Sequence, residues 1–204
     1  MRILGLDEAG RGCVLGPLVM GGFLADGVDQ EVLRAAGAAD SKALSARRRE
    51  AALPRLQALG VLATRRVEPA EIDEGNLNEL EIRAFISLVM ELRPDRVYLD
   101  APVHPRGIPR LQARLVRETG VADWIIEPKA DATWPVVGAA SIGAKLVRDA
   151  AIAALGPVGS GYPSDPVTRA LLTELLRTGA PLPPWVRSRW GTIDALRQQA
   201  LFGG

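Results

Sequence analysis

The sequence predicts an α/β protein built around a mixed β-sheet. Two apolar segments near the N-terminus, 3–6 and 18–24, lie close enough along the chain to pair as antiparallel strands. Farther along, a strand at 96–100, a basic helix at about 107–119 and a strand near 124–127 follow one another. This order and spacing predict a right-handed crossover between parallel strands. We therefore expect both antiparallel and parallel pairs in one sheet.

Helices and a further strand fill the remaining segments. Ser45 is a candidate N-cap for a helix that ends at Gly60, and a strand is expected at 61–67. Apolar residues recur at helical spacing from Leu80 to Leu92, which predicts a helix with one buried face. Pro135 is suited to begin a long helix that continues to about Leu155.

The composition is typical of a globular protein with one core. Of the 204 residues, 48% are hydrophobic and 24% are charged. No internal repeat, low-complexity tract or linker divides the chain. We therefore expect a single domain over 1–204, with a helical C-terminal part from about 166.

Several features favour a cytoplasmic protein that does not enter a membrane. The longest apolar run, 14–25, is too short to span a bilayer and is broken by glycine and proline. Asp7 and Glu8 interrupt the N-terminus too early for a secretory signal. The one cysteine, Cys13, cannot form an internal disulfide and is expected to be a small buried hydrophobe, which fits a reducing compartment.

The basic residues are almost all arginine. The net charge is only +1, so binding to nucleic acid would need a local basic patch. Among the 25 basic residues only Lys42, Lys129 and Lys145 are lysine. These three are candidates for a use that arginine does not serve equally well, such as a compact charge against a phosphate.

Four carboxylates are expected to gather at one edge of the sheet. Asp7, Glu8, Asp100 and Asp131 each fall at, or just past, the end of a predicted strand. Ligand sites collect at the carboxyl ends of parallel strands. Like charges about 4 Å apart repel by on the order of 4 kcal/mol at an effective dielectric constant near 20. Such a cluster favours bound cations, or else some protonated members.

The composition restricts which cation such a site could hold. His104 and Cys13 are the only histidine and cysteine, so a zinc site of nitrogen and sulfur ligands cannot be built. Oxygen ligands alone indicate Mg²⁺ or Mn²⁺. A pair of these ions can activate water and stabilise the leaving oxygen in phosphodiester hydrolysis. His104, between prolines, is expected on the surface rather than in a Ser-His-Asp arrangement.

Three other interpretations compete at this point. Asp7 and Glu8 could simply end a strand before an acidic turn without any function. The glycines at 10, 12 and 16 after a strand resemble a dinucleotide-binding turn, although their spacing is off by one and the two acids would repel a pyrophosphate. A nucleic-acid-binding module without catalysis would explain the basic residues but not four clustered acids.

A set of motifs resembles the ribonuclease HII family, which is the type 2 ribonuclease H family. They occur in order across about 3–192, and the tyrosine loop is similar to that of the archaeal and eukaryotic branch. The motifs are Asp-Glu-Ala-Gly-Arg-Gly at 7–12 with Gly16-Pro17, Asp40-Ser41-Lys42, Asp100, Lys129-Ala130-Asp131, 139–145 with Arg148-Asp149, and the tyrosine loop 161–166.

The resemblance implies a ribonuclease H-like fold, with a five-stranded mixed sheet flanked by helices and a helical C-terminal region. It also implies a metal-dependent endoribonuclease that cuts the RNA of RNA–DNA hybrids, and cuts 5′ to ribonucleotides embedded in duplex DNA. Such an enzyme would use two Mg²⁺ or Mn²⁺ ions and leave 3′-hydroxyl and 5′-phosphate ends. Asp7, Glu8, Asp100 and Asp131 would be the metal ligands and catalytic residues.

The resemblance also assigns the substrate contacts. Gly10, Arg11 and Gly12, with Tyr162, would read the ribonucleotide, since its 2′-hydroxyl separates RNA from DNA and backbone at glycine can approach it closely. The remaining contacts would hold phosphates without reading sequence, and they are Lys42, Ser141 and Lys145.

One motif departs from the family pattern, and two features of related proteins are not seen. The family's Val-Arg-x-Ser-Trp segment reads Val186-Arg187-Ser188-Arg189-Trp190, with Arg189 where serine is expected, so a substrate contact there is in doubt. The N-terminal extension of ribonuclease HIII is not seen, and that family's fourth acid is typically glutamate. No clear sliding-clamp peptide follows Leu201-Phe202, and we expect a monomer.

Overall fold

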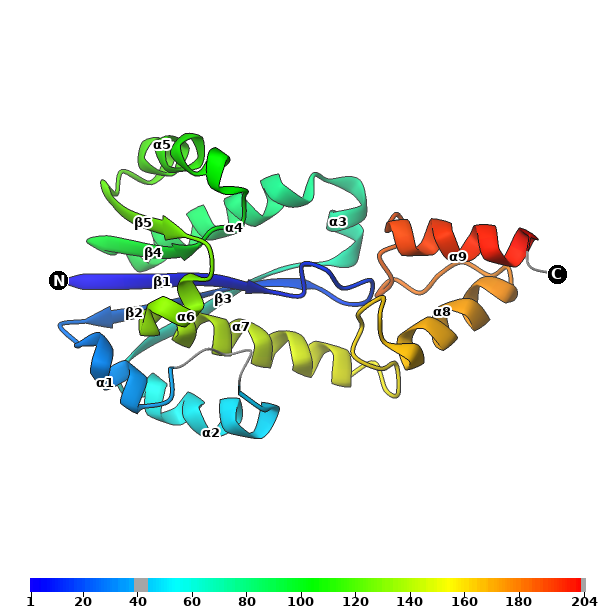
Figure 1. Ribbon diagram of the computed structural model, residues 1–204, viewed down its shortest axis with the longest axis horizontal. Coiled ribbons are helices and arrows are strands. Elements are labelled where there is room, and N and C mark those ends of the chain that lie inside the picture. The colour runs from blue at the N-terminus through cyan, green and yellow to red at the C-terminus, as the bar shows by residue number, and fades with distance from the viewer. Residues whose placement is uncertain (39–43, 203–204) are drawn as a thin grey trace.

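The structure, a computed structural model, describes residues 1–38 and 44–202. Its centre is a five-stranded sheet in the order β3-β2-β1-β4-β5 (Figure 1). The antiparallel half pairs β1 with β2 and β2 with β3, while the parallel half pairs β1 with β4 and β4 with β5. The mixed sheet predicted from the sequence is confirmed. The strands are β1 (Arg2–Ala9), β2 (Leu18–Asp26), β3 (Gly60–Val67), β4 (Arg96–Asp100) and β5 (Asp123–Glu127).

Helix α7 (Pro135–Ala153) covers one face of the sheet at very close range. A Cβ atom at Gly5 would lie 2.1 Å from the carbonyl oxygen of Val136, and one at Gly21 would lie 2.3 Å from that of Ala140. These glycines on β1 and β2 let the helix backbone lie directly on the strands. Alternate residues of a strand face the same side, so Asp7 points toward α7 as Gly5 does.

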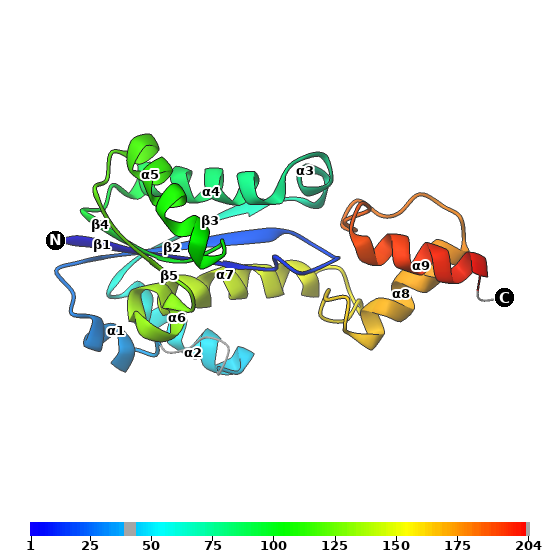
Figure 2. The same ribbon diagram turned by 45° about the horizontal axis from the view of Figure 1, so that its top comes forward.

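Two short helical segments border α7 on this face, α1 (Gln30–Ala35) and α2 (Ala46–Gln57). Figures 1 and 2 show both on the α7 side of the sheet. The hydroxyl oxygen of Ser45 accepts a hydrogen bond from the backbone N–H of Arg48, which confirms Ser45 as the N-cap.

The opposite face carries α3 (Pro69–Glu74), α4 (Leu77–Leu92) and α5 (Ile108–Thr119), and η1 (Pro105–Gly107) precedes α5. Figure 2 shows this layer separated from α7 by the sheet. Side chains from β1, β4 and α4 form the core beneath it, and each fully buried leucine contributes about 1.5–3 kcal/mol. The best-buried members are Leu4, Leu6, Phe85, Leu88 and Leu99.

The C-terminal helices, α8 (Pro166–Arg177) and α9 (Gly191–Phe202), lie beyond one end of the sheet (Figure 1). Their apolar cluster includes Val14 and Leu15, which belong to the segment between β1 and β2. The helical C-terminal part is therefore built onto the turn that follows β1. Within the described ranges, no helix combines the length and apolar character needed to cross a bilayer.

Candidate metal and substrate site

Three carboxylates converge at the carboxyl ends of the parallel strands. Asp7 lies near the end of β1, Asp100 ends β4, and Asp131 lies in the short helix α6 (Ala130–Thr133). One carboxylate oxygen of each lies within 4.8 Å of the others. Because β1 and β4 are parallel neighbours, their ends meet at one edge of the sheet. The sequence therefore predicted this convergence from strand order.

A tight turn brings Asp131 to this edge. Strand β5 ends at Glu127, and Lys129 adopts the left-handed conformation with φ of 61° before α6 begins. The backbone N–H of Ala130 donates to Oδ1 of Asp100 at 3.1 Å, which ties the start of α6 to the end of β4. Asp131 is buried and Asp100 is partly buried.

Among the described residues, no basic side chain forms an ion pair with Asp7. Burial is the main cause that raises the pKa of Asp7 well above its ordinary value, and the charges of Glu8 and Asp100 add to it. Hydrogen bonds from the Ser141 hydroxyl and from the backbone N–H of Glu8, at 2.8 Å, act in the opposite direction. A buried group of acidic oxygens with this unfavourable energy is a suitable ligand set for Mg²⁺ or Mn²⁺.

Glu8 faces the other side of β1. It lies on the α4 side with Leu4 and Leu6, as the alternation along a strand requires. Burial, together with the negative charges of Glu81 and Asp100, raises the pKa of Glu8 to about 7. The group of three carboxylates does not include Glu8. Its role as a fourth ligand stays a prediction.

The glycine-rich turn after β1 leads into β2, whereas a dinucleotide-binding turn opens a helix. Gly10 has a φ of 88°, and a Cβ there would lie 2.8 Å from the carbonyl oxygen of Pro17. Gly12 is exposed, and its nearest neighbour for a Cβ atom would be the ring of Tyr162, at 3.8 Å. The dinucleotide interpretation is therefore not supported, and the turn and Tyr162 lie together as the resemblance implied.

Backbone hydrogen bonds join the tyrosine loop to this turn. The N–H groups of Val14 and Leu15 donate to the carbonyl oxygen of Gly161 at 2.8 and 3.2 Å. The guanidinium of Arg148, on α7, lies 5.1 Å from the centre of the Tyr162 ring. Turn, loop and α7 thus form one continuous surface beside the carboxylates.

Arg11 connects the turn to α4. Its guanidinium forms an ion pair with Glu81 and a hydrogen bond with Oδ1 of Asn78. Glu81 is fully buried, and its Oε1 has no hydrogen-bond partner among the described residues. Sequence reasoning missed Glu81. The sequence did contain one signal for it. Glu81 lies at helical spacing from Phe85 and Leu88, so it falls on the apolar face of the helix.

Arg187 supports the same turn from the C-terminal part of the chain. Its fully buried guanidinium donates to the carbonyl oxygens of Gly10 at 2.7 Å, Arg11 at 3.1 Å and Gly16 at 3.1 Å. It also stacks against Trp190, at 5.0 Å from the ring centre. This contact explains the arginine and tryptophan of the Val186–Trp190 segment, which braces the turn from behind.

The unexpected Arg189 is held away from the turn. The backbone N–H groups of Ser188 and Arg189 donate to the carboxylate of Asp73 at 2.7 and 3.1 Å. The Arg189 side chain donates to the Asp73 carbonyl oxygen at 2.9 Å. Arginine at this position therefore anchors the segment to α3.

The predicted phosphate contacts have different surroundings. Ser141 is fully buried on α7, where its hydroxyl donates to Asp7 and accepts from Nζ of Lys145 at 3.1 Å. Lys145 is partly buried and adjoins the carboxylates through this bond. Lys42 lies outside the described residues. As predicted, Cys13 is buried and His104 is exposed.

Comparisons with known proteins agree on one family. A family model described as Ribonuclease HII matches residues 4–193. The ribonuclease HII of Thermococcus onnurineus is 40% identical over 98% of this chain and 91% of its own length. The crystal structure of ribonuclease H2 from Pyrococcus horikoshii is 38% identical, with a TM-score of 0.88 over 99% of this chain and 100% of that one. The ribonuclease HII of Archaeoglobus fulgidus, solved in a complex with PCNA, has a TM-score of 0.87 at 38% identity over 99% of this chain and 100% of that one.

Proposed function

Because this chain belongs to the ribonuclease HII family of metal-dependent endoribonucleases, we propose that it cuts RNA in RNA–DNA hybrids and also 5′ to single ribonucleotides embedded in duplex DNA. The products would carry 3′-hydroxyl and 5′-phosphate ends. The observation that carries the proposal is the convergence of Asp7, Asp100 and Asp131 within 4.8 Å beside the glycine-rich turn.

The acidic residues would hold two divalent ions at the scissile phosphate. Asp7, Asp100 and Asp131 offer three clustered oxygen ligands, and Glu8 would supply a fourth from the adjacent position of β1. Mg²⁺ or Mn²⁺ bound there supplies an activated water and stabilisation of the leaving oxygen. The raised pKa values of Asp7 and Glu8 support this role, since cations relieve the repulsion that raises them.

The residues around the carboxylates would orient the substrate. Ser141 fixes one carboxylate oxygen of Asp7, and Lys145, bonded to Ser141, would place a positive charge beside the incoming phosphate. Lys42 would provide a further phosphate contact. The protein would act as a monomer.

The glycine-rich turn would select the ribonucleotide. Its carbonyl groups at Gly10 and Arg11 are taken by Arg187, so the turn has a fixed backbone conformation. Gly12 is exposed and has no side chain to keep a sugar away, while the Tyr162 ring lies alongside it. A 2′-hydroxyl could therefore approach backbone groups there and contact the tyrosine ring.

A cleavage assay on three matched duplexes tests the proposal. The first is an RNA–DNA hybrid, the second contains one ribonucleotide in DNA, and the third is DNA alone. We expect Mg²⁺- or Mn²⁺-dependent cutting of the first two, with the cut 5′ to the embedded ribonucleotide, and none of the third. Equal cutting of all three duplexes would contradict recognition of the 2′-hydroxyl, and cutting in excess chelator would contradict the metal site.

A further inference from the structure

A groove lined by arginines together with apolar residues lies on the α4 side of the sheet. It has a volume of about 950 Å³ and lies between the start of α4, the segment after β4, and α5. Asn78 lines it and also binds Arg11 of the glycine-rich turn. Val103 and Gly107, on the segment that follows Asp100, line it as well. The groove is therefore linked to the proposed catalytic site through the Asn78–Arg11 hydrogen bond and through the segment that follows Asp100.

One face of α5 supplies the basic side of this groove. Arg110, Arg114 and Arg117 are spaced four and then three residues apart, so they lie on one face of the helix. Arg110 and Arg117 are both exposed, and their separation of seven residues corresponds to about 10 Å along a helix. This distance matches about three base steps of a nucleic-acid strand at about 3.4 Å each.

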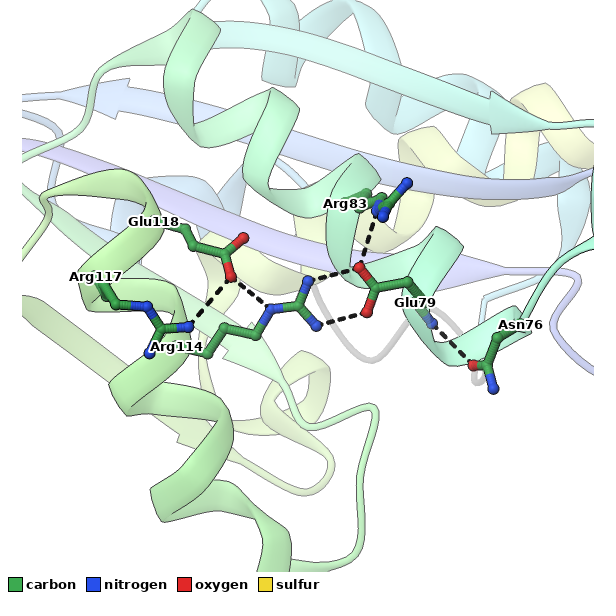
Figure 3. Close-up of polar contacts among 6 residues, drawn as sticks. All are labelled: Asn76, Glu79, Arg83, Arg114, Arg117 and Glu118. Carbon is green, nitrogen blue, oxygen red and sulfur yellow. Dashed lines mark hydrogen bonds and ion pairs between the residues drawn. The ribbon is translucent and has the colours of Figure 1, made fainter.

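The central arginine is held by two glutamates, and Figure 3 shows Arg114 between Glu79 and Glu118. Arg114 makes two hydrogen bonds of 2.7 Å to Glu79 and one of 2.8 Å to Glu118. Arg117 is 70% exposed and contacts Glu118 only at 3.4 Å. Within the described part of the chain, no carboxylate forms an ion pair with Arg110.

The network has an excess of positive charge. Glu79 also binds Arg83, which is 73% exposed, at 2.8 Å. Two glutamates, Glu79 and Glu118, are thus paired with three arginines, Arg83, Arg114 and Arg117. Hydrogen bonds from Arg114 and then Arg83 lower the pKa of Glu79 to about 2, so both partners stay charged at neutral pH.

We infer that this groove binds the sugar–phosphate backbone of the substrate duplex, several nucleotides from the scissile phosphate, through Arg110 and Arg117. The inference rests on the proposed function, because the phosphate chain must continue beyond the carboxylates in both directions. An arginine pair at this spacing, in a groove linked to the site through Asn78, fits such a chain. The contact would position the duplex and would not read its sequence.

The test uses Arg110→Gln with Arg117→Gln, in an Asp7→Asn background that should bind without cutting. Binding of a fluorescent duplex with one ribonucleotide is measured by anisotropy between 50 and 200 mM salt. We expect about tenfold weaker binding at 100 mM salt, and a plot of log affinity against log salt that is less steep by about 1.8, which corresponds to two lost phosphate contacts.

The matched control is Arg34→Gln with Arg93→Gln in the same background. Both arginines lie toward the amino end of β1, at the C-terminal ends of α1 and α4. Their substitution removes the same total charge as that of Arg110 and Arg117. We expect wild-type affinity and an unchanged salt dependence. An equal loss of affinity in the control pair would show that the effect depends on net charge alone, and it would overturn the inference.

Duplex length gives a second, independent readout. Shortening the duplex to three base pairs on one side of the ribonucleotide should remove the difference in affinity between the Arg110/Arg117 variant and its parent. Shortening the duplex on the other side should leave that difference in affinity unchanged. A difference that persists with both short duplexes would overturn the inference. So would unchanged duplex binding together with lost binding of a polyglutamate peptide, which would indicate an acidic protein ligand instead.

The two proposals fail separately. If the unaltered protein cuts the ribonucleotide-containing duplex and the arginine pair has no effect on binding, the groove assignment is wrong and the catalytic assignment stands. If the unaltered protein cuts no duplex, the proposed function fails, whatever the binding results.

Discussion

Two glutamates near the same edge of the sheet, Glu8 and Glu79, have pKa values displaced in opposite directions. Burial, with the charges of Glu81 and Asp100, raises the pKa of Glu8 to about 7. Hydrogen bonds from Arg114 and Arg83 lower that of Glu79 to about 2. The chain therefore neutralises its own acid in the arginine network, whereas among the described residues neither acid at the end of β1 forms an ion pair. The difference separates a region suited to cations from a region suited to phosphates.

Removing one of the acids at the end of β1 should have the largest effect. We expect Asp7→Asn to lower the cleavage rate by about a thousandfold or more, because a lost metal ligand forfeits several kcal/mol of charge stabilisation. The metal-free variant should also be more stable than the unaltered protein at pH 8, since a buried negative charge is gone. Rates on the ribonucleotide-containing duplex and thermal unfolding in chelator measure the two effects.

The matched control for Asp7→Asn is Glu174→Gln, which removes an exposed acid that pairs with Arg177 on α8. It should leave both the rate and the stability nearly unchanged. Full activity of Asp7→Asn would show that this residue is not needed in a metal site. It would also contradict the contrast drawn between the acids at the end of β1 and the arginine network.

Glu81 is an intermediate case, since it is fully buried with one arginine for compensation. We expect Glu81→Gln to weaken the hold on Arg11 and to reduce kcat/KM on the ribonucleotide-containing duplex by about tenfold, mainly through KM. The pKa of Glu8 should fall, since the Glu81 charge helps to raise it. An unchanged kcat/KM, with unfolding as in the unaltered protein, would show that Arg11 needs no support from α4.

The stability of the metal-free protein should fall as the pH rises from about 4.5 to about 7. Glu8 binds a proton more tightly in the folded than in the unfolded protein, so its contribution is complete below the unfolded pKa and lost as pH rises through the folded one. For a chain of this size each kcal/mol changes the melting temperature by about 2–4 °C. Thermal scans should show a decline that Mg²⁺ or Mn²⁺ reverses, most strongly at pH 8. If the stability of Glu8→Gln declined with pH by the same amount, the decline would have to come from other groups.

The smallest effect is expected in the arginine network. A double-mutant cycle with Glu79→Gln and Arg114→Gln should give a coupling free energy of at most about 1 kcal/mol, because both side chains are partly exposed to solvent. The coupling should decrease in 0.5 M salt. A coupling of several kcal/mol would mean that the network is a structural core rather than a charged surface.

Much of the fold was predictable because its elements carry local signals. The strand 96–100 and the helix 80–92 follow from apolar patterns, and β4 and α4 confirm them. The convergence of Asp7 with Asp100 follows from strand direction alone. These features depend on a few neighbouring residues, or on one topological rule.

The rest depends on contacts between distant segments, which no local pattern encodes. Glu81 looks like any helical glutamate until Arg11 is placed beside it. Glu8 was predicted as a ligand from its place at a strand end and from the family resemblance, and that role stays a prediction. That it faces the opposite side of β1 from Asp7 follows from the alternation along a strand. Arg187 was expected only as part of a motif, and its contacts with the turn became clear from the fold.

The bond between Arg187 and Gly10 joins positions 177 residues apart. During synthesis the turn therefore lacks its brace until nearly the whole polypeptide has emerged, a delay of about 10–40 s at about 5–20 residues per second. We expect unfinished chains to be inert toward hybrids, even though all four acids have already been translated. We therefore expect nuclease activity to appear only after the segment with Arg187 has been made.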